Sequence, residues 1–124
     1  MTRERVSVIG MVALLGAAGV THFVKPEFYL KIVPRFIPDP DAVVLWSGVA
    51  EIILAATIAL PRTRRLAAIA AMVFFVVVFP ANIQHALDAQ PGTTERWATL
   101  VRLPIQPLLI WWAYSVARRS PRTR

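Results

Sequence analysis

The sequence contains no cysteine and has few charged residues, which make up 17% of its 124 positions. Without cysteine the chain can form no disulfide, thiol nucleophile, cysteine-ligated zinc site or iron–sulfur cluster. Hydrophobic residues make up 56% of the chain, which excludes a disordered or collagen-like protein and is too apolar for a soluble domain of this length. We therefore expect one domain embedded in a membrane.

Signature motifs of self-sufficient enzymes are also missing. The sequence has no GxGxxG or Walker motif, no HExxH, no serine nucleophile elbow and no CxxC. An autonomous enzyme is therefore not favoured, and any redox chemistry must come from a partner. The sequence assigns no catalytic residue, no metal ligand and no intrinsic cofactor.

Four apolar runs dominate the chain, at residues 6–23, 42–60, 66–87 and 97–117. Each has about the 20 residues that a helix needs to cross a hydrocarbon core of about 30 Å. None alternates polar and apolar residues, so a transmembrane β-barrel is excluded. Short connections make sequential helices antiparallel neighbours. The sequence thus predicts an all-α membrane protein, an up-down-up-down bundle of four transmembrane helices.

The distribution of lysine and arginine predicts the orientation of these helices. Nine of the 14 basic residues lie at the end that holds both termini and the second connection, and the more basic side faces the cytoplasm. We expect a multi-pass protein of the bacterial inner membrane with both termini cytoplasmic, one domain over 1–117 and a basic cytoplasmic tail over 118–124. The net charge of +7 then reflects topology and not nucleic-acid binding. The nine residues are Arg3, Arg5, Arg62, Arg64, Arg65, Arg118, Arg119, Arg122 and Arg124.

Short polar residues mark where the last three helices begin. Asp39 precedes Pro40, a pair typical of a cap followed by the first helical position. Thr63 is a candidate cap for the third helix and Thr94 for the fourth. The apolar runs are therefore expected to form separate helices.

The first run has two interpretations. Arg3 and Arg5, followed by an apolar stretch and small residues, are typical of a cleavable signal peptide. If the run is retained, Ala13, Gly16 and Ala17 form a small-residue face suited to close packing against another helix. We expect the retained helix, because cleavage would leave only three spans.

The longest connection, between the first two runs, is itself amphipathic. Tyr29, Ile32, Val33 and Phe36 have the i, i+3, i+4, i+7 spacing of one helical face. Pro34 must break such a helix. The pattern predicts a short amphipathic interfacial helix between helices 1 and 2, which serves either as a lipid anchor or as a lid over the outer end of the bundle.

Glu51 is the most informative residue, since it lies on the order of 13 Å from the outer end of its run. A carboxylate at that depth costs at least about 2.5–3.5 kcal/mol, so it should face the interior and have a partner. Arg102 enters its run from the same side and is the expected partner in a buried ion pair. In the alternative interpretation, Arg102 reaches the interface and Glu51 is neutral.

Three further polar residues are expected to join this pair. Helical side chains lean toward the helix N-terminus, which brings His22 and Asn82 to the level of Glu51 and Arg102, with Gln106 one turn along. The five residues are the predicted ligand-binding set, in a pocket open to the outside. A metal site of His22, His85 and Glu51 is an alternative without a supporting spacing motif. A second alternative is that the polar groups only set helix register. The predicted set is His22, Glu51, Asn82, Arg102 and Gln106.

Several short motifs occur in a fixed order on the four runs. They are Gly19-x-x-His22-Phe23, Pro26 and Phe28, Val33-Pro34, Pro38, Ser47-Gly48-x-x-Glu51-Ile52, Phe79-Pro80-Ala81-Asn82-Ile83, Arg102-Leu103-Pro104-x-Gln106 and Trp111-Trp112. Together they resemble the DoxX family over nearly the whole chain, in a subgroup with His-Phe where many members end the first helix with a Gly-x-x-Lys motif. The resemblance implies a four-helix integral membrane protein, with some relatives linked to quinone-dependent or stress-related oxidoreductases.

These features lead to three functional hypotheses. The first is a non-catalytic accessory subunit or binding module for a small amphiphile, with a quinone as candidate ligand. The second is a membrane oxidoreductase subunit in which Glu51 or His22 relays protons to a bound quinone. The third is a purely structural interaction partner. Expected partners are the lipid bilayer, an extracytoplasmic or membrane redox protein, and a second copy of the chain.

Overall fold

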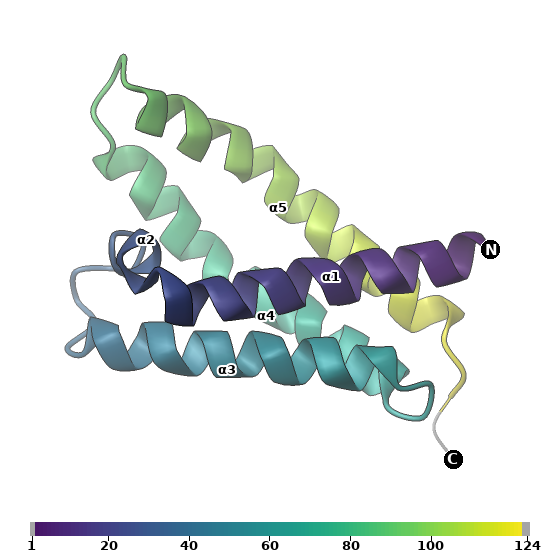
Figure 1. Ribbon diagram of the computed structural model, residues 1–124. Coiled ribbons are helices and arrows are strands. Elements are labelled where there is room, and N and C mark those ends of the chain that lie inside the picture. The colour runs from purple at the N-terminus through teal and green to yellow at the C-terminus, as the bar shows by residue number, and fades with distance from the viewer. Residues whose placement is uncertain (1, 123–124) are drawn as a thin grey trace.

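The computed structural model describes residues 2–122, which form helices and connecting turns without any strand. These residues form four long helices and one short helix, α2, which lies near the ends of α1 and α3 (Figure 1). The prediction of an all-helical protein is confirmed for this part of the chain. The helices are α1 (Arg3–Val24), α2 (Pro26–Leu30), α3 (Pro40–Ala59), α4 (Arg64–Asp88) and α5 (Thr94–Arg119).

Within residues 2–122, three helices are long and apolar enough to cross a membrane, namely α1, α3 and α4. Their exposed sides carry large hydrophobic residues, as expected for surfaces in contact with lipid. α5 has 26 residues, but Arg102 and Gln106 interrupt its apolar stretch. The protein is therefore a membrane protein by composition, with three of the four expected spans identified.

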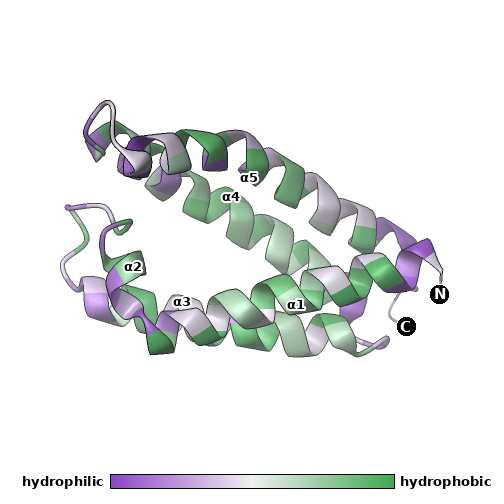
Figure 2. Cartoon of the chain, turned by 45° about the horizontal axis from the view of Figure 1, so that its top comes forward, coloured by the Kyte–Doolittle hydropathy of each residue, from purple (hydrophilic) through white to green (hydrophobic). Residues whose placement is uncertain are grey.

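The long helices pack as two pairs, α1 with α3 and α4 with α5. In Figures 1 and 2 the pairs converge near the two termini and diverge toward α2. The hydrophobic core lies at the converging end, where Met11, Leu15, Ile58, Ala71 and Ala113 are at most 1% exposed. The diverging end has no comparable apolar core and holds the polar side chains described below.

The contact between α1 and α3 depends on two glycines. A Cβ added to Gly19 would lie 2.6 Å from Ile52 Cγ1, and one added to Gly48 would lie 2.6 Å from His22 Cβ. The predicted packing face of α1 is wrong in its residues, because Ala13 and Ala17 are exposed. The face that packs instead consists of Met11, Leu15, Gly19 and His22. Since these residues line the core and the contact with α3, α1 is an integral part of the fold.

The predicted helix cap is confirmed at the start of α3, whereas the capping of α4 and α5 differs from the prediction. The Asp39 side chain accepts a hydrogen bond from Ala42 N at 3.2 Å, which confirms its role as a cap. Thr63 occupies the cap position of α4, but its hydroxyl donates to the Thr57 carbonyl instead. The cap of α5 is Thr93 and not Thr94, because the Thr93 hydroxyl accepts from Arg96 N.

The short helix between α1 and α3 begins earlier than predicted. α2 covers Pro26–Leu30, with Pro26 at its first position, where a missing N–H costs nothing. Since proline disfavours the helical conformation in the residue before it, the chain leaves the helix ahead of Pro34. The predicted apolar face does not continue to Phe36, which is 80% exposed.

Basic residues gather at the converging end of the molecule. The first residues of α1, the α3–α4 turn and the last residues of α5 all lie there (Figure 1). Two of the arginines bind carbonyls near helix ends: Arg64 donates to Ile58 O at 2.7 Å and Arg65 to Ala117 O at 3.4 Å. In the predicted basic tail, residues 123 and 124 lie outside the described residues.

Candidate binding site

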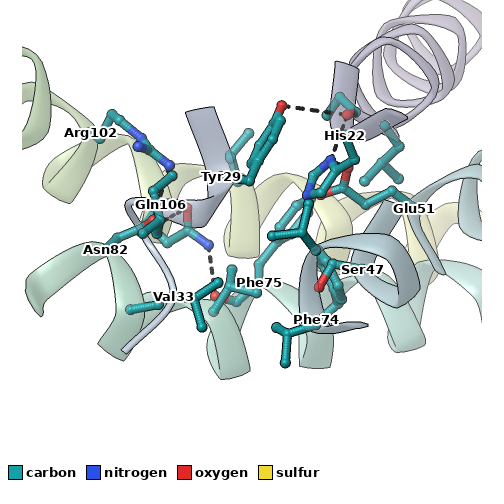
Figure 3. Close-up of a pocket in the computed structure, with 18 of the residues that line it drawn as sticks. His22, Tyr29, Val33, Ser47, Glu51, Phe74, Phe75, Asn82, Arg102 and Gln106 are labelled. Carbon is teal, nitrogen blue, oxygen red and sulfur yellow. Dashed lines mark hydrogen bonds and ion pairs between the residues drawn. The ribbon is translucent and has the colours of Figure 1, made fainter. Parts of the chain in front are cut away.

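A cavity of about 280 Å³ lies between the two helix pairs at their diverging end. Side chains from α1, α2, α3, α4 and α5 line it, together with residues of the α2–α3 connection (Figure 3). Its walls are mostly apolar, and its polar groups are few. All five predicted site residues lie on this wall, so the structure brings them together from four helices. The polar side chains of the wall are His22, Tyr29, Ser47, Glu51, Asn82, Arg102 and Gln106.

One side of the cavity carries a chain of hydrogen bonds between α4 and α5. Arg102 donates to Asn82 Oδ1 at 3.0 Å, and Asn82 Nδ2 donates to Gln106 Oε1 at 3.2 Å. Gln106 Nε2 in turn donates to the main-chain oxygen of Phe75 at 2.7 Å. Asn82 and Gln106 are each 6% exposed, so both amides need these partners. The chain holds the Arg102 guanidinium at the cavity wall.

Gln106 bonds the main chain of α4 in the turn that precedes its proline. Pro80 has no N–H, so the Val76 carbonyl one turn earlier has no helical donor. The carbonyl of the neighbouring Phe75 accepts from Gln106. A side chain of the facing helix thus bonds the main chain of α4 beside this interruption.

The opposite side of the cavity holds a histidine and a carboxylate from α1 and α3. His22 Nδ1 lies 2.7 Å from the Ala18 carbonyl oxygen and 3.3 Å from Glu51 Oε2. A carbonyl can only accept, so this contact assigns the proton of the ring to Nδ1. That single proton points to Ala18 and leaves the neighbouring carboxylate oxygen without it. Glu51 Oε2 has no hydrogen-bond partner among residues 2–122.

The expected ion pair between Glu51 and Arg102 is not formed. In the described part of the chain, the contacts within 4.0 Å between a carboxylate and a basic side chain are His22–Glu51 and His85–Glu95. The two helices that carry Glu51 and Arg102 belong to different pairs, and these pairs diverge at the level of the cavity (Figure 2). Each charged group therefore bonds within its own pair, and the cavity separates them.

Tyr29 of α2 is a cavity residue that the polar pattern of the spans does not reveal. Its ring stacks on His22 with a centroid distance of 3.5 Å and an interplanar angle of 15°. Its hydroxyl lies 3.4 Å from the Ala18 carbonyl, which it shares with His22 (Figure 3). Burial raises the pKa of the Tyr29 phenol. The amphipathic pattern of the connection was the available signal, because Tyr29 lies on its apolar face.

A family model described as a domain of unknown function, DUF8561, matches residues 11–117. The chain belongs to this family. No curated protein and no solved structure matches the chain. The match covers every residue that lines the cavity, so the candidate site lies within the DUF8561 domain.

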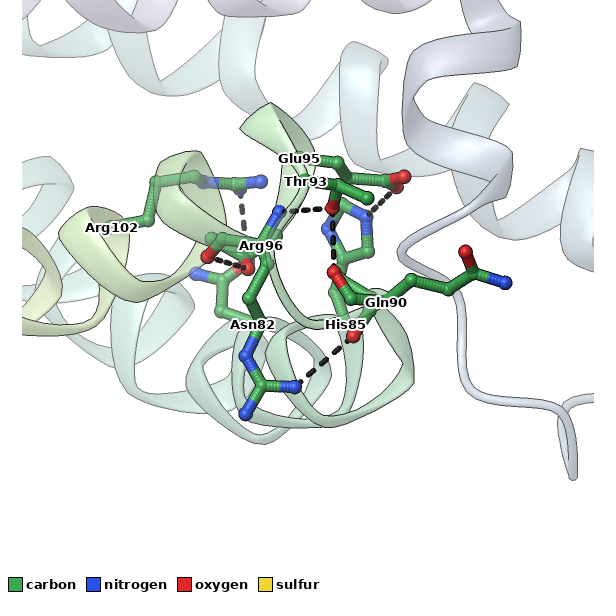
Figure 4. Close-up of polar contacts among 9 residues, drawn as sticks. Asn82, His85, Gln90, Thr93, Glu95, Arg96 and Arg102 are labelled. Carbon is green, nitrogen blue, oxygen red and sulfur yellow. Dashed lines mark hydrogen bonds and ion pairs between the residues drawn. The ribbon is translucent and has the colours of Figure 1, made fainter.

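His85 takes no part in the site of this DUF8561 protein. Its Nε2 lies 3.0 Å from Glu95 Oε1 across the α4–α5 turn, where Arg96 also donates to Ala89 O at 3.1 Å (Figure 4). Within residues 2–122 no three His, Asp or Glu side chains come together as metal ligands. The alternative set of His22, His85 and Glu51 is therefore not assembled, since His85 closes the turn instead.

Proposed function

We propose that α5 is a fourth transmembrane helix and completes an up-down-up-down bundle in a bacterial inner membrane. α5 packs along α4, and its 26 residues span about 39 Å, more than the hydrocarbon core requires. Arg96 and Arg102 lie in its outer part: the long Arg96 side chain can reach the interface, and Arg102 is bonded to Asn82 at the cavity wall. The basic end then faces the cytoplasm, and α2 lies at the outer membrane–water interface.

The lack of cysteine allows a direct test of this topology. Arg62→Cys and Gln90→Cys introduce single thiols in exposed turns at opposite ends of the bundle. In intact cells a membrane-impermeant maleimide should label Gln90→Cys, and it should label Arg62→Cys only after the membrane is permeabilised. The reverse pattern, or labelling of both variants in intact cells, would contradict the proposal.

We propose further that this protein is a DoxX-type accessory subunit or binding module, non-catalytic, whose cavity takes the head group of a small amphiphile such as a quinone. One observation carries the proposal: among residues 2–122, a buried carboxylate oxygen without a donor faces a mostly apolar cavity, and a guanidinium without a carboxylate partner lies on the opposite side of that cavity. Glu51 is 8% exposed and has an oxygen with no donor, and Arg102 has no carboxylate partner in the described chain. A buried carboxylate oxygen without a donor is costly, which favours a ligand that supplies its partner.

A single substituted ring with oxygens at both ends meets these requirements. Arg102 can donate to an oxygen at one end, and Glu51 can bond a hydroxyl at the other. The rings of Tyr29 and Phe75 provide apolar contact between them. The cavity volume of about 280 Å³ is near the lower limit for small-molecule sites, which suits one ring and not a larger cofactor.

The contact between His22 and Glu51 favours a second candidate function. The two groups are 3.3 Å apart, and each can take up and release a proton, which is the arrangement needed to pass a proton to a bound quinone. In this case the protein acts as a subunit of a membrane oxidoreductase and not as a passive module. In this case the His22→Gln variant should reduce the quinone-dependent turnover of a partner reductase, and not only the affinity of the cavity for its ligand.

Ligand binding is tested by thermal unfolding of the purified protein in lipid nanodiscs. A dimethoxy-methyl-benzoquinone should raise the melting temperature of the wild type, because a ligand that binds only the folded state stabilises it. The Glu51→Gln and Arg102→Gln variants should show less than half of that shift. Glu4→Gln and Arg62→Gln are matched controls, because both residues are exposed and far from the cavity. If saturating quinone leaves the melting temperature of the wild type unchanged, the proposal is wrong.

A further inference from the structure

A second hollow adjoins the cavity on the lipid-facing side of α3. It is an apolar groove between α3, the end of the α2–α3 connection and Phe74 of α4. Ala42, Trp46 and Ala50 line it at intervals of four residues, so they form one stripe along the helix. Trp46 is 67% exposed, and the groove is open over most of its length.

The groove and the cavity share part of their walls. Val43, Ser47 and Phe74 line both. These three side chains therefore form the partition between the cavity and the lipid-facing surface. The partition lies between α3 and α4, which pack less closely on each other than α1 on α3 or α4 on α5.

The partition consists of side chains and not of main chain. Ser47 is small, and Phe74 is only half-buried. The polar side chains of the cavity lie behind it, and the groove in front of it offers only hydrocarbon contact. Going inward from the membrane, the surroundings change from lipid to the apolar groove and then to the polar side chains of the cavity. A tailed amphiphile has the same order, with an apolar tail followed by a polar head group.

The geometry points to a lateral binding path, in which the hydrocarbon tail of the ligand lies in the groove of Ala42, Trp46 and Ala50 while its head group occupies the cavity. The ligand class is thus a tailed amphiphile that enters from the membrane between α3 and α4, and not a water-soluble compound. This inference rests on the proposed binding function. It adds the identity of the tail site and the direction of entry.

The test compares two probes in nanodiscs: a dimethoxy-methyl-benzoquinone without side chain, and its decyl homologue. Ala50→Phe fills the groove from a position that is not itself part of the cavity wall. Ala56→Phe is the matched control, since it makes the same change at an exposed position of α3 outside the groove. The probes dissolve in the lipid to the same extent with both variants, so a difference in measured affinity between the variants reports binding to the protein.

Affinities are measured by titration at fixed lipid content. Ala50→Phe should weaken binding of the decyl probe about tenfold and leave the short probe within about twofold of the wild type. Ala56→Phe should change neither. Equal loss of both probes, or no loss of either, would overturn the lateral path while leaving the head-group site intact. Failure of the wild type to bind either probe would refute the proposed function itself, and the tail site with it.

Discussion

His22 Nδ1 lies 3.3 Å from Glu51 Oε2, and this contact joins α1 to α3 at the level of the cavity. Both residues are buried, at 6% and 8% exposure. The arginine on the far side is held by Asn82 and not by this carboxylate. The charged groups of the site thus belong to two separate networks, with different expected responses to mutation.

A double-mutant cycle should reveal this separation. His22→Ala and Glu51→Ala should show a coupling energy of about 0.5–3 kcal/mol, as expected for residues in contact. Glu51→Ala and Arg102→Ala should be additive within about 0.5 kcal/mol, because they share no hydrogen-bond partner. Unfolding in mixed micelles provides the free energies. Strong coupling between Glu51 and Arg102 would show that the two networks are one.

Asn82 is the central member of the other network. Asn82→Leu removes the acceptor of Arg102 and the donor to Gln106, so it leaves two polar groups unpaired. We expect a loss of about 2–4 kcal/mol in unfolding free energy, roughly the cost of two unsatisfied buried groups. Gln84→Leu is the control on the same helix. A similar loss in both variants would mean that the amide network contributes nothing specific.

The glycine contact between α1 and α3 predicts unequal effects of alanine. Gly48→Ala places a Cβ 2.6 Å from His22 Cβ, and we expect a loss of about 1–3 kcal/mol from overpacking. Gly16→Ala meets no atom closer than 3.9 Å and should be neutral, or stabilising by up to about 1 kcal/mol, because alanine favours the helix. Thermal unfolding of the two variants in parallel checks this order, and equal effects would contradict it.

Tyr29 should show its burial in a pH titration. Its folded-state pKa is raised above the ordinary value of about 10, so the unfolded state releases the phenol proton first. The contribution of this phenol to the free energy of unfolding is fully present below a pH of about 10 and is lost as the pH rises beyond it. In Tyr114→Phe the remaining tyrosine is Tyr29, whose tyrosinate absorbance should appear above the ordinary midpoint. A midpoint at or below about 10 would place Tyr29 in water.

Local patterns in the sequence predicted an all-helical protein and five of the polar residues that line the cavity. Glu51 stands out because an ionisable group in an apolar run must face a protein interior. The lean of helical side chains brought Asn82 and Arg102 to one level, and they are bonded in the structure. The fold was therefore predictable wherever one helix alone carried the information.

The errors concern relations between helices. The Glu51–Arg102 pair was expected because both residues lie in the outer half of the bundle, but the distance across it depends on the angle between the pairs. That angle is set by packing at the other end, where Met11 and Ala113 fill the core. Likewise, the packing face of α1 depends on where Gly48 allows close approach, which α1 alone does not reveal.

The helix pairs are packed together at one end only, so they can rotate relative to each other about the converging end. α3 is about 30 Å long, so a rotation of about 5° displaces its end at the cavity by about 2.6 Å. That displacement is comparable to the radius of an aromatic ring. Small repacking near the termini is therefore amplified at the mouth of the cavity, so bilayer thickness or a protein docked at the converging end can influence a site that it does not touch.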